Sequence, residues 1–140
     1  MEIFFKDLSY SVVGALMEVH RVLGPGFLEK IYCEAVSYEL SQRGLLFERE
    51  VAVAVLYKGQ TMGDYRCDFV IEKSLILEIK AISRLTKAHQ AQALNYLAGS
   101  GIQLAILANF GASSLEYQRV VRKSAELGAT PTTSTPACPG

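Results

Sequence analysis

The chain has 140 residues, one domain's worth, and half of them are hydrophobic, which is enough for a sizeable core. Acidic and basic residues balance at 14 each, so no global field favours a nucleic-acid or membrane partner, although a local basic patch stays open. Scattered cysteines, an N-terminus unlike a signal peptide and no apolar run of membrane-spanning length favour a cytoplasmic protein without a disulfide framework or a membrane partner.

The first part of the chain predicts two helices. Apolar residues at helical spacing predict the first over residues 8–22, with Ser9 as a candidate N-cap. Gly24-Pro25-Gly26 breaks that pattern, and a second helix is expected over about residues 27–43. The residues expected to point inward are Leu8, Val12, Leu16, Val19 and Leu23 in the first helix, and Leu28, Ile31, Ala35, Tyr38 and Leu40 in the second.

Strand patterns follow. Residues 45–57 predict a strand that ends at a turn of Lys58, Gly59 and Gln60. Residues 61–80 predict a hairpin whose polar turn, Glu72-Lys73-Ser74, places Ile71 opposite Leu75.

The second half continues with a helix over about residues 85–98, capped by Ser83 or Thr86. The apolar run 102–110 predicts a central strand covered on both faces, and a last strand is expected over residues 115–121. The order, ααβββαββ, predicts an α/β or α+β layer fold. We expect one domain over residues 1–123 and a disordered low-complexity tail over residues 124–140.

The hairpin carries the most functional information. Its register would place Asp68 opposite Glu78, and Lys80 points to the same face as Glu78 because side chains alternate along a strand. Two opposed carboxylates repel each other, and a divalent metal would explain the pair. Asp68, Glu78 and the carbonyl of Ile79 suit Mg²⁺ or Mn²⁺. Lys80 could orient an attacking water or stabilise a phosphorane-like transition state.

Other candidates lie on the two neighbouring helices. Gln92 and Tyr96 are four residues apart and share a helix face, with His89 about one turn earlier. Glu29 follows the Gly-Pro-Gly break and shares its helix face with largely apolar residues, which a solvated glutamate would rarely choose. Those apolar neighbours are Tyr32, Cys33 and Val36.

These motifs resemble a known group of enzymes. Asp68 followed by Glu78-Ile79-Lys80 resembles the PD-(D/E)xK nuclease superfamily. Gln92-Ala-Leu-Asn-Tyr96 resembles the Gln-xxx-Tyr motif of its RecB-like and lambda-exonuclease-like branches. Gly26-Phe-Leu-Glu29-Lys-Ile-Tyr32 resembles the signature of the small bacterial GxxExxY proteins.

The resemblance covers about residues 8–122 and implies a restriction-endonuclease-like core, a mixed sheet flanked by helices, that cleaves DNA phosphodiesters with Mg²⁺. The proline of the superfamily's Pro-Asp motif is Cys67 here, which puts little in doubt because that proline is often absent. The roles that the resemblance implies are metal ligation by Glu29, Asp68 and Glu78, catalysis by Lys80, and positions flanking the site for Gln92 and Tyr96.

Each candidate also has a purely structural interpretation. The hairpin carboxylates could form a solvated strand face, but Val70 and Ile76 share that face and are apolar. Glu29 could simply complement a helix N-terminus. Glu34 is a rival on the same helix but looks solvated, and His20 is best read as a hydrogen-bonded core histidine. Gln92 with Tyr96 could be a helix surface pair, His89 a structural residue, and Arg84, Lys87, Arg119, Arg122 and Lys123 either phosphate contacts or solvated side chains.

Three hypotheses follow. The chain is a Mg²⁺-dependent nuclease, acting on DNA more readily than on RNA. Alternatively, it is a catalytically silent module that binds nucleic acid or protein and retains the nuclease fold, which its neutral charge and small size favour. In a third interpretation it is a homo-oligomer or a subunit of a larger complex, which would supply the binding surface that a small domain lacks.

Overall fold

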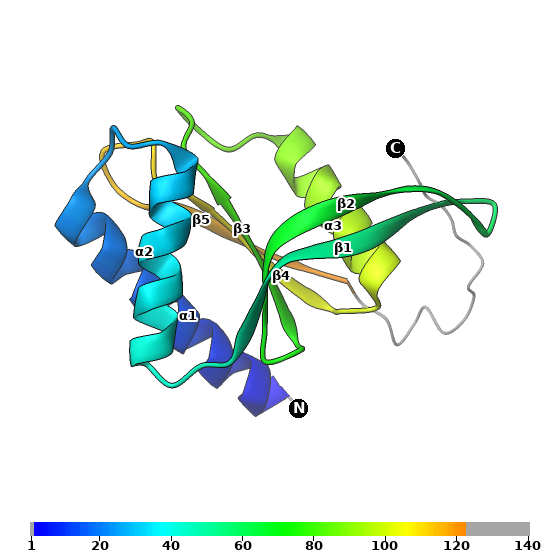
Figure 1. The fold of residues 1–140 in the computed structure, drawn as a ribbon, viewed down its shortest axis with the longest axis horizontal. Helices are drawn as coiled ribbons and strands as arrows, with labels where there is room; N and C mark the ends of the chain where they lie inside the picture. Colours follow the sequence, from blue (N-terminus) through cyan, green and yellow to red (C-terminus); the bar gives the residue numbers. More distant parts are fainter. Residues whose placement is uncertain (1, 123–140) are drawn as a thin grey trace.

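The computed structural model describes residues 2–122, and its elements follow the predicted order ααβββαββ (Figure 1). The low-complexity tail, residues 124–140, lies outside the described residues. The helices are α1 (Glu2–Leu23), α2 (Glu29–Gln42) and α3 (Lys87–Ser100), and the strands are β1 (Phe47–Tyr57), β2 (Gln60–Ile71), β3 (Leu75–Lys80), β4 (Leu104–Asn109) and β5 (Glu116–Val121).

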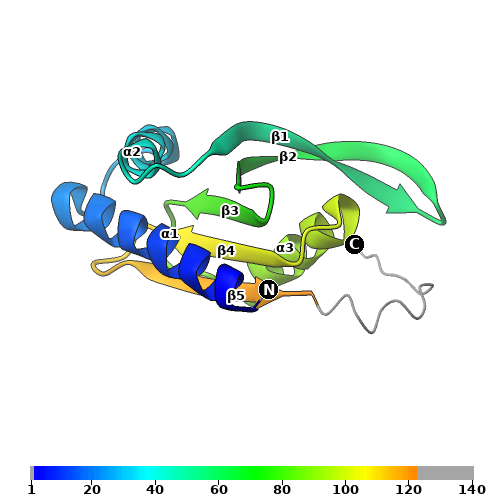
Figure 2. The ribbon, with the colours of Figure 1, turned by 90° about the horizontal axis from the view of Figure 1, so that it is seen from below.

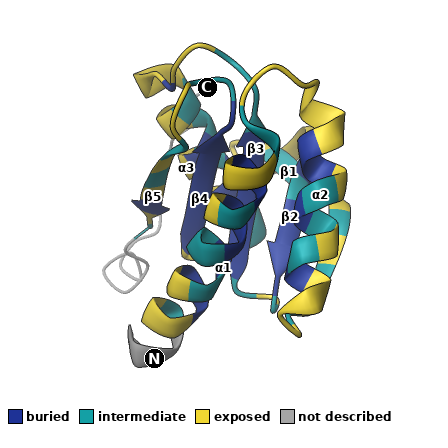
Figure 3. Ribbon diagram, turned by 90° about the vertical axis from the view of Figure 1, so that its left-hand side faces the viewer, coloured by how far each residue is buried: buried dark blue, intermediate teal, exposed yellow. Residues whose placement is uncertain are grey.

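The strands form one sheet in the order β1-β2-β3-β4-β5. Neighbours are antiparallel except β3 and β4, which are parallel because α3 carries the chain from one to the other. α1 and α2 cover one face of the sheet and α3 covers the other (Figures 2 and 3). This arrangement confirms the predicted α/β class with a mixed sheet flanked by helices.

Alternation along the strands supplies two separate cores. Phe69 and Leu77 point toward α1 and α2, whereas Val70 and Ile76 point toward α3. β4 is buried along its whole length, as predicted for a central strand, and it appears dark blue in Figure 3. The two faces of β3 therefore contribute to different cores, and neighbouring residues along this strand have entirely different surroundings.

The first helix begins earlier than predicted. α1 starts at Glu2, so Ser9 lies inside the helix and not at its N-cap. Its hydroxyl is buried and has no hydrogen-bond partner among the described residues. The predicted inward stripe of this helix is otherwise confirmed, since Leu8, Val12, Leu16 and Val19 are buried.

The second helix is rotated relative to the prediction. Leu28, Ile31 and Tyr38 are exposed, and the buried stripe of α2 is Tyr32, Cys33, Val36 and Leu40. The rotation has a local cause, because the Tyr32 hydroxyl donates a hydrogen bond to the carbonyl of Gly24 and accepts one from the amide of Phe27. The ring of Tyr32 also stacks on Phe110, with 4.6 Å between ring centroids.

Both predicted turns occur, with one change in length. Glu72-Lys73-Ser74 forms the predicted three-residue loop, with Ile71 paired to Leu75. The first turn has two residues, Lys58 and Gly59, both at positive φ, as expected of a type I′ hairpin. No helix among residues 2–122 combines the length and the apolar character needed to cross a membrane.

Candidate active site

The candidate site lies where β2 separates from β3. Pairing of these strands runs from Ile71 with Leu75 to Phe69 with Leu77, and Asp68 and Glu78 are the next residues outward. On the other side of β2, the pairing with β1 skips Glu50 and Asp68. Glu50 has a φ of 51°, an unusual conformation for a non-glycine residue in a strand. The sheet therefore bends at Asp68, and β1 and β2 continue as a two-stranded ribbon (Figure 2).

The two carboxylates hold the strands together at this separation. Glu78 Oε2 accepts a hydrogen bond of 2.9 Å from the amide of Asp68. Asp68 Oδ2 accepts one of 2.8 Å from the amide of Ile79. Each carboxylate thus replaces a backbone ladder bond, and its second oxygen, Oδ1 or Oε1, makes no hydrogen bond to the described residues. The predicted opposition of Asp68 and Glu78 is confirmed.

Burial dominates the electrostatics of the pair. Glu78 is 4% exposed, and burial together with the nearby Asp68 raises its pKa to about 8. Burial also raises the pKa of Asp68, against the lowering effects of the Ile79 amide and of Lys80. Lys80 ends β3 and makes no ion pair with the described residues, although its charge favours ionisation of both carboxyl groups. A site built this way is short of positive charge.

A buried amide holds the segment that follows Lys80. Asn109 Oδ1 accepts hydrogen bonds from the amides of Ile82 (2.9 Å) and Gly111 (3.0 Å). Its Nδ2 donates to Glu116 Oε1 at 3.0 Å, and that oxygen also accepts a bond from the amide of Leu85. This network joins the carboxyl ends of β3 and β4 to the segment that leads into α3, and it fixes the backbone that follows Lys80.

Glu29 is the first residue of α2, it is exposed, and its charge acts on Glu78 and is acted on by Asp68. Its pKa is raised first by burial and then by the charge of Asp68, while Lys80 lowers it. The hydrogen bonds of Tyr32 hold the preceding loop and thereby the start of this helix. The structure brings Glu29, Asp68, Glu78 and Lys80 into mutual electrostatic range, but among residues 2–122 no three His, Cys, Asp or Glu side chains are placed to hold one ion.

The residues predicted on α3 separate into different roles. Tyr96 is buried, and its pKa is raised first by burial and then by Glu78, so it lies near the carboxylates. Its ring meets Tyr65 edge-on at 5.2 Å. Gln92 is half-buried one turn earlier and makes no hydrogen bond that ties it to the site. His89 completes the capping box of α3, where its Nδ1 accepts the Thr86 amide at 2.9 Å.

Several structural interpretations of single residues hold. His20 is buried, its Nε2 lies 3.0 Å from the carbonyl oxygen of Ala112, and its ring stacks on Phe110. Burial raises the pKa of Cys33 to about 12 and of Cys67 to about 11, so neither is an activated nucleophile. Among the basic residues weighed as phosphate contacts, Arg84, Lys87 and Arg119 are exposed, Arg122 is half-buried, and Lys123 lies outside the described residues.

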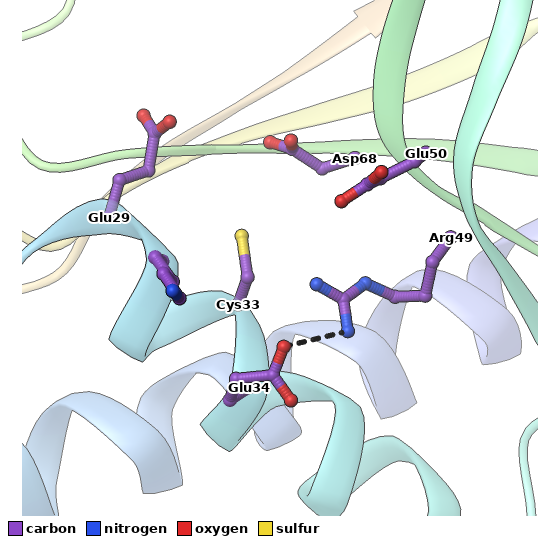
Figure 4. Close-up of a pocket in the computed structure, with 7 residues that line it drawn as sticks. Glu29, Cys33, Glu34, Arg49, Glu50 and Asp68 are labelled. Atoms are coloured by element: carbon purple, nitrogen blue, oxygen red, sulfur yellow. Dashed lines mark hydrogen bonds and ion pairs between the residues drawn. The ribbon is translucent and has the colours of Figure 1, made fainter.

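A cavity of about 410 Å³ opens between α2 and the bend of β1 and β2 (Figure 4). Asp68 and Glu29 line it, whereas Glu78 and Lys80 do not. Its remaining lining residues are Lys30, Cys33, Glu34, Arg49 and Glu50. Arg49 and Glu50 are absent from the sequence-derived candidates. Only the register of β1 against β2 beyond the irregularity between Val55 and Leu56 places Glu50 beside Asp68.

The donor set fits a magnesium ion better than a metal held entirely by protein. The open oxygens of Asp68 and Glu78 are hard ligands, and Mg²⁺ is commonly bound by one or two carboxylates, with water and substrate phosphates completing its shell. Glu78 is buried and Asp68 is half-buried, and burial raises the pKa of both despite the charge of Lys80, so the pair has a reason to attract a divalent ion. The absence of a three-residue cluster among residues 2–122 is compatible with such a site.

Comparisons with known proteins point to one family. A family model described as the PD-(D/E)XK nuclease superfamily matches residues 6–120. No curated protein sequence is a significant match. The crystal structure of SSO0001 is similar, with a TM-score of 0.51 and 20% identity, over 70% of this chain and 52% of that chain. This similarity concerns the fold alone.

A second solved structure is the alkaline exonuclease LHK-Exo from Laribacter hongkongensis, with a TM-score of 0.45 and 13% identity. The match covers 71% of this chain and 58% of that chain. The present chain thus corresponds to little more than half of each of the two solved structures.

Proposed function

Because the chain belongs to the PD-(D/E)XK nuclease superfamily, we propose that it is a Mg²⁺-dependent nuclease that hydrolyses phosphodiester bonds, with DNA as its substrate. One observation carries the proposal. Asp68 and Glu78 are fixed by reciprocal bonds to each other's strand, each with one open oxygen, and Lys80 follows on the same strand face. A nuclease site needs this combination of metal ligands and a neighbouring cation.

The residues have distinct roles in this proposal. A bound Mg²⁺ would lower the pKa of a water and neutralise charge on the phosphate. Asp68 and Glu78 would hold the ion, with Glu29 of α2 as a further candidate ligand. The ammonium of Lys80 orients the attacking water or stabilises the charge that develops on the phosphate oxygens. Tyr96 packs near the carboxylates and Gln92 flanks them, and both stay candidates for contacts to substrate.

We also place the chain in the GxxExxY group, within the RecB-like and lambda-exonuclease-like part of the superfamily. The structure offers a physical reason for that signature. Gly26 has a φ of 111°, which favours glycine, and Tyr32 ties the loop that contains it. Glu29, between them, is thereby directed toward Asp68.

Cleavage assays test the proposal. We expect the protein to cut supercoiled, linear or single-stranded DNA in the presence of Mg²⁺ or Mn²⁺, and an RNA substrate to be cut more slowly. Lys80→Ala should lower the rate by roughly 100-fold or more, because one electrostatic contact to the transition state is lost. Lys6→Ala, which removes an exposed lysine on α1, is the matched control. Cleavage that is independent of metal or unchanged in Lys80→Ala would contradict the proposal.

The alternative is a silent module that retains the fold. The neutral charge of the chain and the absence of a three-ligand cluster among the described residues favour it. Mn²⁺ titration separates the two functions, because a ligand that binds only the folded state raises the melting temperature. Sedimentation of the purified protein tests the homo-oligomer that the sequence leaves open.

A further inference from the structure

Arg49 occupies the cavity beside the carboxylates and has no role in the proposed chemistry so far. It lies on β1, next to Glu50 and paired with Phe69 of β2. Its guanidinium lies over the ring of Phe69, with 4.9 Å from its central carbon to the ring centroid. Figure 4 shows the guanidinium directed into the cavity, between Glu34 on α2 and the carboxylates of Glu50 and Asp68. The side chain is thus held in one plane by its packing.

The hydrogen bonds that this guanidinium makes to described residues all involve one nitrogen, Nη1. Nη1 donates to Ser37 Oγ at 2.8 Å and lies 3.3 Å from Glu34 Oε2. Nε is buried and has no acceptor among the described residues. A buried donor without an acceptor costs free energy and calls for an explanation. The Nε–Nη2 edge of the guanidinium is an edge to which two oxygens of one carboxylate or phosphate group can bind.

A purely structural role explains only half of this side chain. The pair with Glu34 is long, and the Glu34 side chain is 66% exposed, so this ion pair contributes little stability. Packing over Phe69 and the bond to Ser37 fix the orientation, but neither uses the Nε–Nη2 edge. A lysine would serve as well for a salt bridge, whereas a rigid fork suits phosphate oxygens.

The charges of the cavity point to the same ligand. Four carboxylates line it and would repel a phosphodiester: those of Glu29, Glu34, Glu50 and Asp68. Arg49 and Lys30 are the cations of the lining, and Arg49 is the one held by packing. A strand whose phosphate reaches the carboxylate pair therefore needs a fixed positive group on this side.

We propose that Arg49 binds the non-bridging oxygens of a backbone phosphate of the substrate strand through its Nε–Nη2 edge, in the cavity next to Asp68. This inference rests on the proposed function, because it assigns a substrate contact to that site. Arg49 is a binding residue here, and Glu34 and Ser37 are the groups that position it.

Salt dependence of DNA binding tests the assignment. Each phosphate contact contributes about 0.9 to the slope of log K against log[salt] for duplex DNA and about 0.7 for single strands. Binding is measured by fluorescence anisotropy with a labelled oligonucleotide and Mn²⁺, in the Lys80→Ala background so that the DNA stays intact. Arg49→Met keeps a long apolar stem over Phe69 and removes the charge. We expect it to lower the slope by about one contact and to weaken binding about 10- to 100-fold.

Three further variants separate charge from geometry. Arg49→Lys should keep the slope and still weaken binding, because the charge remains while the fork is lost. Arg21→Ala on α1 removes an exposed arginine that pairs with Glu18, and it should change neither quantity. Glu34→Gln with Ser37→Ala removes the positioning bonds, and it should leave the slope intact.

The outcomes are separable from those of the nuclease assay. A folded Arg49→Met protein with an unchanged slope overturns the inference, even if the wild-type protein cleaves DNA. If Arg49→Met lowers the slope but the wild-type protein cuts no DNA, the phosphate contact stands and the nuclease proposal is removed. If Arg49→Met does not fold, equal affinities of Arg49→Lys and the parent protein overturn the inference.

Discussion

At the scale of single residues, Glu78 is the carboxylate whose surroundings most change its chemistry. It is almost fully buried, it lies beside Asp68, and its pKa rises to about 8. In the folded protein without metal, Glu78 therefore retains its proton at a pH where an exposed glutamate is ionised. A metal ion would displace that proton. The residue is suited to a ligand that arrives with positive charge.

This pKa predicts a pH-dependent stability that Glu78→Gln should remove. The folded pKa lies above the unfolded value, so the folded state binds more protons between about pH 4.5 and about pH 8, and stability falls as pH rises through that window. Glutamine does not ionise, yet its oxygen can still accept the Asp68 amide. Without metal, we expect the unfolding free energy of Glu78→Gln, measured relative to that of the wild type, to rise by a few kcal/mol between about pH 5 and about pH 9.

Urea denaturation across that pH range, with chelator present, checks this prediction. Glu34→Gln is the control, because Glu34 is exposed on α2 and its loss should not reproduce the trend. Parallel stability curves for wild type and Glu78→Gln would mean that Glu78 ionises normally in the folded protein.

At the scale of secondary structure elements, α2 is positioned by one hydroxyl group more than by its own sequence. The helix has no side-chain N-cap, and Leu28 at its start is exposed. Tyr32 instead binds the loop of Gly24 and Phe27 and stacks on Phe110 at the end of β4. The rotation that this imposes exposes Leu28, Ile31 and Tyr38, which were predicted to point inward, whereas the predicted burial of Leu40 is confirmed. It also brings Glu29 into electrostatic range of Asp68 in the bend of β2.

Tyr32→Phe should therefore reduce stability by about 1–2 kcal/mol, because the Gly24 carbonyl and the Phe27 amide lose their partner while the aromatic stack is kept. We also expect weaker Mn²⁺ binding if the start of α2 sets the position of Glu29. Tyr38→Phe, an exposed tyrosine on the same helix, should change neither. Denaturation and Mn²⁺ titration of the two variants measure this, and equal behaviour would contradict the positioning role.

At the scale of the whole molecule, the two cores place the site between them. α1 and α2 pack on one face of the sheet and α3 on the other, and the site lies where β2 leaves this sandwich. Glu29 approaches from the first face, whereas Tyr96 approaches from the second. Metal binding at this point would join both layers, so its free energy should appear in the stability of the whole domain.

We predict that Mn²⁺ raises the melting temperature more at higher pH. Proton loss from Glu78 accompanies binding, so the affinity should fall as the pH drops below about 8, by up to about tenfold per pH unit. At a Mn²⁺ concentration about 100-fold above its Kd, the gain is about 2.7 kcal/mol, or several degrees for a domain of this size. Asp68→Asn should abolish the shift. A shift independent of pH would show that Glu78 is not a ligand.

Much of the site could be predicted because its parts are close in sequence. The turn of Glu72, Lys73 and Ser74 sets the register by its length, so Asp68 and Glu78 must face each other once the hairpin forms. The central position of β4 also follows from its uninterrupted apolar run. The metal, nucleic-acid and catalytic roles of these residues stay predictions.

The residues that were missed depend on longer-range contacts. Arg49 joined the site through a bend in β1 that starts at Glu50, whose positive φ no local pattern announces. Ser9 looked like a cap because helical periodicity does not show where a helix begins. The predicted inward face of α2 was wrong at Leu28, Ile31 and Tyr38 because several apolar stripes compete on that helix, and the hydrogen bonds of Tyr32 to the preceding loop decide between them.

The sequence by itself determined the order of elements, the hairpin register and the family, because each depends on local spacing or on short motifs. Only the tertiary structure decided that β2 separates from β3 at Asp68, that burial raises the pKa of Glu78, and that Arg49 lines the cavity beside Asp68 with its Nε left without an acceptor among the described residues. Burial and the approach of distant charges are properties of packing, and they arise when residues far apart in the chain exclude water together.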